Sequence, residues 1–209
     1  KVIDLNWLEE LVSYALVTPF IKGEYPVSLL IAAEVEEGKT LTLSKFASVS
    51  SVIYQTDFTR YGLLKEWLPG LQKKTKRSIV VPDIVALLES KGPAPRAALL
   101  GFLTSLTEEG VTNIDTYGTS YHFDPALRCN IIVGAPAAIV KNTRRWKAWT
   151  DIGLTSRLLP VTYSYTQESV SRILTYVRQR QYVNEAQVTL PTLQDDYEIK
   201  MNESLAELL

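Results

Sequence analysis

The chain has 209 residues, of which 46% are hydrophobic and 22% are charged, and its formal net charge is −1 at pH 7. This composition excludes an intrinsically disordered chain and predicts a substantial core, in one large domain or in one domain with a small appendage. Because the net charge gives no global field for nucleic acid, any binding of DNA would depend on local patches.

Predicted strands and helices alternate along the chain. Strands are predicted at 27–32, 51–57, 78–83, 130–134 and 158–163, with a hairpin over 113–123. Helices are predicted at 4–18, 61–72, 84–90, 95–109 and 167–180, and a short strand and a final helix follow in the last thirty residues. This alternation is typical of a three-layer α/β fold with a mostly parallel sheet. We interpret residues 1–24 as a helical lead-in, 25–166 as the core and 167–209 as a C-terminal helix with a small appendage.

The most informative motif follows the first predicted strand. Residues 33–40 read Ala-Glu-Val-Glu-Glu-Gly-Lys-Thr, which matches the phosphate-binding P-loop G-x-x-x-x-G-K-[ST] except for Ala33 at the first glycine. In such a loop the Lys39 ammonium would reach the β- and γ-phosphates, and the Thr40 hydroxyl would sit on Mg²⁺. The predicted nucleotide-binding set is Glu34, Glu37, Gly38, Lys39, Thr40 and Leu41. A charged turn between strand and helix remains the alternative, because three glutamates crowd an anion site.

Three further positions are candidates for metal binding and for orienting water. Asp83 ends an apolar strand about 45 residues after the loop, on the next-but-one strand, and could hold the Mg²⁺ shell. The alternative for Asp83 is a cap on the helix that begins at Ile84. Asp57 ends the second predicted strand, beside the expected phosphate position, and ranks first as the water-orienting group. Glu109 ranks after it, and Glu34 is a third choice inside the loop, although each carboxylate alone also suits a solvated surface.

The order of P-loop, Asp-ended strand, hairpin, apolar strand and the segment Gly-Leu-Thr-Ser-Arg-Leu-Leu at 153–159 resembles AAA+ ATPases over roughly residues 25–180. It is most similar to the clade of minichromosome maintenance helicases, and also to ATPases of archaeal and phage-like mobile elements. The resemblance implies ATP and Mg²⁺ as ligands and a ring of identical subunits, such as a hexamer. It also implies that Arg157 is an arginine finger for the neighbouring subunit's γ-phosphate.

Three departures from the family pattern favour nucleotide binding over hydrolysis. Ile84 stands where the family usually has a catalytic Glu, and the fourth strand ends in Gly-Ala-Pro-Ala at 134–137 without a polar sensor residue. Ala33 replaces a glycine. A degenerate ATPase that binds nucleotide without hydrolysing it therefore stays open.

A basic and aromatic cluster at 141–149 is the candidate DNA contact. It contains Lys141, Arg144, Arg145 and Lys147 together with Trp146 and Trp149, a mixture that can bind phosphates and stack bases. The alternative is that the two tryptophans share one buried helix face, since they are three residues apart. The tip of the predicted hairpin, by contrast, carries no Lys or Arg.

Three hypotheses follow for the function. The first is an AAA+-like ATPase that acts as a ring-forming motor or switch on DNA, in the setting of a mobile genetic element or virus. The second is a nucleotide-binding assembly or packaging factor with a structural ATP site, and the third is an α/β interaction protein with an accidental Gly-Lys-Thr. The single Cys129 and the lack of an apolar run near 18 residues predict a cytoplasmic protein without a membrane partner.

Overall fold

The computed structural model describes residues 4–116, 119–178, 190, 196 and 197. Its centre is a five-stranded sheet in the order β2-β3-β6-β1-β7, and every neighbouring pair is parallel. The strands are β1 (Leu29–Ala33), β2 (Val52–Tyr54), β3 (Ser78–Val81), β6 (Asn130–Pro136) and β7 (Leu159–Tyr163). The predicted α/β class and the mostly parallel sheet are therefore confirmed.

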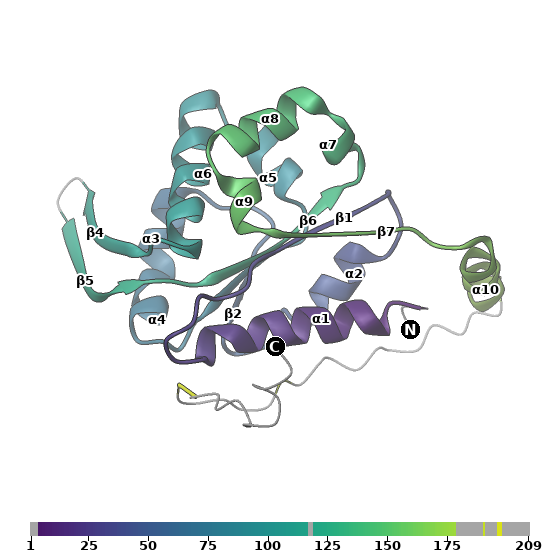
Figure 1. Ribbon diagram of the computed structural model, residues 1–209, viewed down its shortest axis with the longest axis horizontal. Coiled ribbons are helices and arrows are strands. Elements are labelled where there is room, and N and C mark those ends of the chain that lie inside the picture. Colours follow the sequence, from purple (N-terminus) through teal and green to yellow (C-terminus); the bar gives the residue numbers. More distant parts are fainter. Residues whose placement is uncertain (1–3, 117–118, 179–189, 191–195, 198–209) are drawn as a thin grey trace, which may run out of the picture.

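Helices cover both faces of this sheet (Figure 1). They are α1 (Asn6–Val17), α2 (Lys39–Ser44), α3 (Arg60–Glu66), α4 (Leu68–Gln72), α5 (Ile84–Glu89), α6 (Pro93–Thr107), α7 (Ala138–Lys141), α8 (Thr143–Asp151), α9 (Leu154–Arg157) and α10 (Gln167–Arg178). Strand residues alternate between the two faces because the side-chain period of a strand is two. In β1, Leu29 and Ile31 pack with α1 and α2, whereas Leu30 packs with the cluster that contains α3 to α6 and α9.

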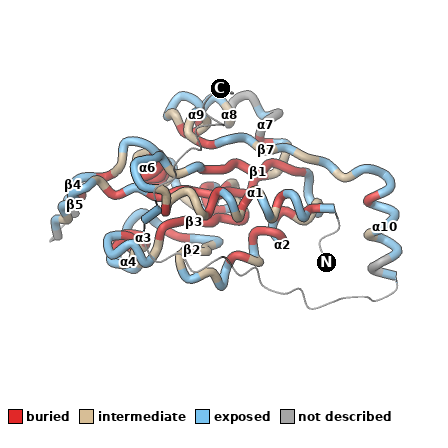
Figure 2. The backbone as a smooth tube through the Cα atoms, turned by 60° about the horizontal axis from the view of Figure 1, so that its bottom comes forward, coloured by how far each residue is buried: buried red, intermediate tan, exposed pale blue. Residues whose placement is uncertain are grey.

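The buried residues concentrate in the middle layer, as Figure 2 shows along β1 and β3. Helix α1, predicted as a lead-in, buries Leu8, Val12 and Leu16 completely and belongs to the core. The predicted helix at 61–72 is two helices, because α3 stops at Glu66 and Pro69 lies in the first turn of α4, where a missing backbone N–H costs nothing.

Two elements extend from the body at opposite ends (Figure 1). The predicted hairpin is an antiparallel pair, β4 (Val111–Thr116) and β5 (Thr119–Leu127), whose tip at 117–118 lies outside the described residues. At the other end, α10 is held to the start of the described chain by Asp4, which accepts hydrogen bonds from Ser169 and Arg172. Of the short strand predicted at 197–201 the structure describes only Tyr197, which forms a β-bridge with Ile21, and the predicted final helix lies outside the described residues.

Candidate functional site

The topology of the sheet selects one place for a ligand. The helix that follows β1, α2, packs on one face, whereas the helices that follow the adjacent strand β6 pack on the other. Connections that leave two neighbouring strands on opposite faces open a crevice outside their carboxyl ends, which is where open α/β sheets bind ligands. The segment 34–38 leaves the carboxyl end of β1 at this point of the sheet.

The loop itself has the backbone of an anion-binding turn. Glu36 and Gly38 have left-handed φ angles of 69° and 79°, and such residues turn backbone N–H groups toward a shared concavity. A non-glycine residue in this region costs about 1–2 kcal/mol, so the fold has to impose it on Glu36. Ala33, in contrast, is the last residue of β1 and has no positive φ. Its position is ordinary extended backbone, which explains why the chain does without a glycine there.

Lys39 begins α2 directly after this loop and is only 8% exposed. Within the part of the chain that the structure describes, its ammonium has neither a hydrogen bond nor an ion pair. Its Nζ is not among the buried polar atoms that lack a hydrogen-bond partner, so the aliphatic stem is packed while the ammonium still reaches solvent. The Lys39 ammonium can therefore take an anion as its partner without giving up a contact within the described part of the chain. Its neighbours Thr40 and Leu41 are exposed on the first turn.

The carboxylate of Glu37 folds back into the loop. One oxygen accepts from the backbone N–H of Glu34 at 3.0 Å and the other accepts from the N–H of Tyr165 at 3.1 Å. The Tyr163 hydroxyl donates to the Glu37 carbonyl at 2.9 Å, so the loop is tied to the end of β7. Burial, and then the charges of Tyr165 and Glu37, raise the pKa of Tyr163 well above its usual range, which keeps this hydroxyl a donor. The Glu37 carboxylate is therefore an anion that already accepts a hydrogen bond from one backbone N–H of the loop, that of Glu34.

Asp83 lies at the same edge of the sheet as the loop, after β3, which is the next-but-one strand from β1. Strands lie about 4.8 Å apart, so two intervals separate their axes by roughly 10 Å. Gly134 of β6 lies between them, and a Cβ at this position would be 2.1 Å from the Pro82 carbonyl oxygen. The glycine thus lets the segment before Asp83 approach β6. The Asp83 carboxylate caps α5 by accepting from the N–H groups of Val85 and Ala86, and its metal role stays a prediction.

The two water-orienting candidates lie away from the loop. Asp57 follows β2 at the edge of the sheet, with β3 and β6 between it and β1, so two strands separate it from the loop and its role in orienting water stays a prediction. Its carboxylate pairs with Lys91 at 2.5 Å. Glu109 follows α6 and comes before the hairpin that leads into the amino end of β6, which is the opposite edge of the sheet. A role for Glu109 in the loop's own site is therefore not supported by its position.

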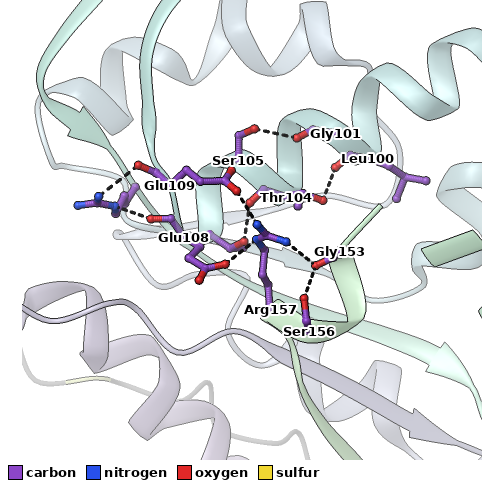
Figure 3. Close-up of polar contacts among 11 residues, drawn as sticks. Leu100, Gly101, Thr104, Ser105, Glu108, Glu109, Gly153, Ser156 and Arg157 are labelled. Atoms are coloured by element: carbon purple, nitrogen blue, oxygen red, sulfur yellow. Dashed lines mark hydrogen bonds and ion pairs between the residues drawn. The ribbon is translucent and has the colours of Figure 1, made fainter. Parts of the chain in front are cut away.

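Arg157 also lies at the amino edge, two residues before β7 begins, and Figure 3 shows its polar contacts. Its guanidinium contacts the Glu109 carboxylate at 2.5 Å, the Glu108 carboxylate at 2.7 Å and the Gly153 carbonyl at 2.8 Å. The Nε contact with Glu108 is an ion pair without the alignment of a hydrogen bond. Arg157 thus joins α9 to the end of α6 within one chain. Asp151, a carboxylate close to Arg157 in the sequence, pairs with Lys147.

The basic and aromatic cluster forms α8. Trp149 is 6% exposed, and Trp146 packs against the same core cluster, so the alternative of a shared buried helix face is confirmed. Lys147 is exposed and pairs with Asp151 four residues later. The side chains of Lys141, Arg144 and Arg145 lie outside the described residues, and DNA binding through this cluster stays a prediction.

Sequence reasoning missed the partners that decide these roles. Tyr163, Tyr165, Lys91 and Glu108 carried no motif, and each contacts a candidate residue that is distant in the sequence. Among the described residues no three His, Cys, Asp or Glu side chains gather as a metal site; a P-loop Mg²⁺ takes one hydroxyl, one carboxylate and the phosphates instead. Within the same residues no helix is long and apolar enough to cross a bilayer.

Comparison with protein-family models found no matching family, and a search of curated proteins found no similar sequence.

Proposed function

We propose that the chain is an ATP-binding P-loop protein of the AAA+ kind, which acts in a ring of identical subunits as a nucleotide-dependent motor or switch on DNA. The observation that carries the proposal is Lys39, a residue with a packed stem whose ammonium has no partner among the described residues, directly after a loop with two left-handed residues. Phosphate oxygens are the partner that this cation and the loop N–H groups together suit.

The proposal assigns each residue a limited role. Lys39 and the backbone of 34–38 hold the phosphates, while Thr40 and Asp83 hold the Mg²⁺ that ATP brings. Bound Mg²⁺ neutralises charge on the β- and γ-phosphates. The Glu37 carboxylate has to leave the Glu34 N–H before a phosphate can use that donor. Arg157 serves a neighbouring subunit only if its contacts with Glu108 and Glu109 open in the ring.

A binding-only switch is the second candidate, and specific observations favour it over hydrolysis. Asp83 is engaged as a helix cap, and Ile84 follows it. Asp57 is paired with Lys91, and Glu109 with Arg157. None of these carboxylates is available near the loop to orient a water. In this version nucleotide stabilises an assembly instead of driving movement.

The test is a titration with fluorescent ATP in the presence of Mg²⁺, followed by turnover measurements with and without DNA. We expect saturable binding that unlabelled ATP competes away. Turnover stimulated by DNA supports the motor, whereas binding without turnover supports the switch. Failure to bind ATP up to millimolar concentration would leave the third hypothesis, an α/β interaction protein with an accidental Gly-Lys-Thr.

A further inference from the structure

A cavity of about 480 Å³ lies at the amino edge of the sheet, away from the P-loop. Its lining comes from the segment between α1 and β1, from the turn before β3, and from β5. Lys22, Lys74, Lys76, Arg77 and Arg128 supply five cations to this lining, against the carboxylates of Glu24, Asp124 and Asp196. A cavity with this charge balance suits an acidic ligand.

Arg77 is the cation of this cavity that needs a carboxylate as its partner. Its side chain is 7% exposed, it lies over the ring of Phe20 at 4.3 Å, and it donates to the carbonyls of Pro19 and Lys74. Its one carboxylate partner within the described residues is Asp196, at 2.5 Å. A buried guanidinium without a counter-charge is strongly unfavourable, so the cavity requires an anion at this position.

The anion is the Asp196 carboxylate, in a short segment that is more than 100 residues from Arg77 in the sequence. Tyr197 donates its backbone N–H to the Phe20 carbonyl at 2.6 Å, and its own carbonyl accepts from the N–H of Lys22 at 2.7 Å. These bonds make a parallel β-bridge between Ile21 and Tyr197. Asp196 then lies between Lys74 and Arg77, and hydrogen bonds from both lower the pKa of its carboxyl group. Backbone pairing plus a side-chain anchor is how proteins add a peptide strand to an exposed backbone.

We propose that the wall of this cavity formed by residues 20–22, Lys74 and Arg77 is a docking site for an acidic peptide strand, in which an Asp pairs with Lys74 and Arg77 and the next residue pairs with the backbone at 20–22. The segment Asp196–Tyr197 is the resident occupant of this docking site, and Asp196 thereby lines the cavity. The site recognises a carboxylate followed by a residue whose backbone can form the β-bridge. A second peptide with these two features therefore displaces Asp196–Tyr197. This site does not depend on the proposed nucleotide binding.

The probe is a fluorescent peptide with the sequence of residues 192–200, Thr-Leu-Gln-Asp-Asp-Tyr-Glu-Ile-Lys. Its control is the same peptide with Asn in place of the Asp at 196. The full-length Asp196→Asn protein, whose own segment is weakened, is expected to bind the probe at least tenfold more tightly than the wild-type protein. Adding Lys74→Glu, a change at a half-exposed side chain, is expected to reduce this binding about tenfold. The control peptide is expected to bind neither protein.

A second measurement keeps the test decisive if Asp196→Asn does not fold. The full-length wild-type chain carries a fluorophore at its C-terminus, and excess unlabelled peptide is added. Displacement of the resident segment is expected to lower the fluorescence anisotropy, and the Asn peptide is expected to leave it unchanged. Equal effects of the two peptides, or no effect of either at millimolar concentration, would overturn the proposal and make Asp196–Tyr197 a fixed part of the fold.

Discussion

The two edges of the central sheet treat their buried cations differently. At the amino edge, Arg77 and Arg157 each contact at least one carboxylate and one backbone carbonyl. At the carboxyl edge, Lys39 is as deeply buried as Arg77 but has no partner among the residues that the structure describes. The two arginines therefore hold parts of the chain together, whereas the lysine is the cation that we propose for a ligand.

This difference between paired and unpaired cations predicts different effects of substitution at the two edges. Removing one partner of a buried ion pair leaves the charge of the other partner uncompensated, which destabilises the fold. Removing the Lys39 charge breaks no ion pair among the described residues. Substitutions at the two edges should consequently differ in the size of their effect on stability, which makes the comparison testable.

The largest expected effect is at Gly134, which brings β6 close to Pro82. Gly134→Ala would put a Cβ 2.1 Å from a backbone oxygen, so we expect a loss of about 3 kcal/mol in the free energy of unfolding. Gly101→Ala is the control, because a Cβ there meets nothing within 4 Å and alanine favours the helix by about 0.5–1 kcal/mol. Urea unfolding measures both. An unchanged Gly134→Ala protein would mean that the carboxyl edge is not tightly packed.

Next is the clamp of Arg157 at the amino edge. Its side chain is 18% exposed and those of Glu108 and Glu109 are 57% exposed, so Arg157→Met should cost about 1 kcal/mol of unfolding free energy through the lost bonds to these carboxylates and to the Gly153 carbonyl. Lys147→Met, in an exposed pair with Asp151, should cost at most about 0.5 kcal/mol. Chemical denaturation of the two variants compares them. If ATP turnover exists and Arg157→Met abolishes it without loss of stability, the residue is a finger and not a clamp.

A smaller effect is expected at Glu37, whose carboxylate takes two backbone N–H groups. Glu37→Gln removes the competing anion, and we expect ATP to bind about threefold more tightly, which corresponds to about 0.7 kcal/mol. Glu36→Gln removes the same charge from the same loop without those contacts. Fluorescent-ATP titrations of both variants should therefore differ. Equal affinities would show that only the general negative charge matters.

The smallest effect is on pH dependence at the amino edge. Hydrogen bonds from Lys74 and Arg77 lower the pKa of Asp196 below 3.8. A lowered pKa means that its contribution to stability is fully present above pH 3.8 and is lost as the pH falls through the folded-state value. The stability difference between wild type and Asp196→Asn should shrink in this acid range and stay constant from pH 5 to 7. A difference that grows on acidification would contradict the pairing.

The sequence predicted much of the fold but few of the contacts that define the sites. Strand positions followed from runs such as 27–32 and 78–83, because buried parallel strands are continuously apolar. The alternation of elements gave no information on the order of the strands in the sheet. We therefore expected Asp57 beside the loop, whereas β2, which it follows, is an edge strand. The short helices α7 and α9 were missed, since four residues carry too little periodicity. The pairing of Arg157 with Glu108 and Glu109 joins segments nearly fifty residues apart, which no local pattern reveals.

The proposed nucleotide site depends most on Lys39, and one variant tests the role of this residue directly. Lys39→Met keeps the length of the side chain and removes the charge, with Lys65→Met on exposed α3 as the charge-matched control. We expect Lys39→Met to bind ATP·Mg²⁺ at least tenfold more weakly, since a charge-assisted phosphate contact is worth about 1.5–3 kcal/mol, while its unfolding free energy stays equal or rises. ATP binding within twofold of the parent, or a loss of stability like that of Arg157→Met, would contradict the assignment of this cation to a ligand.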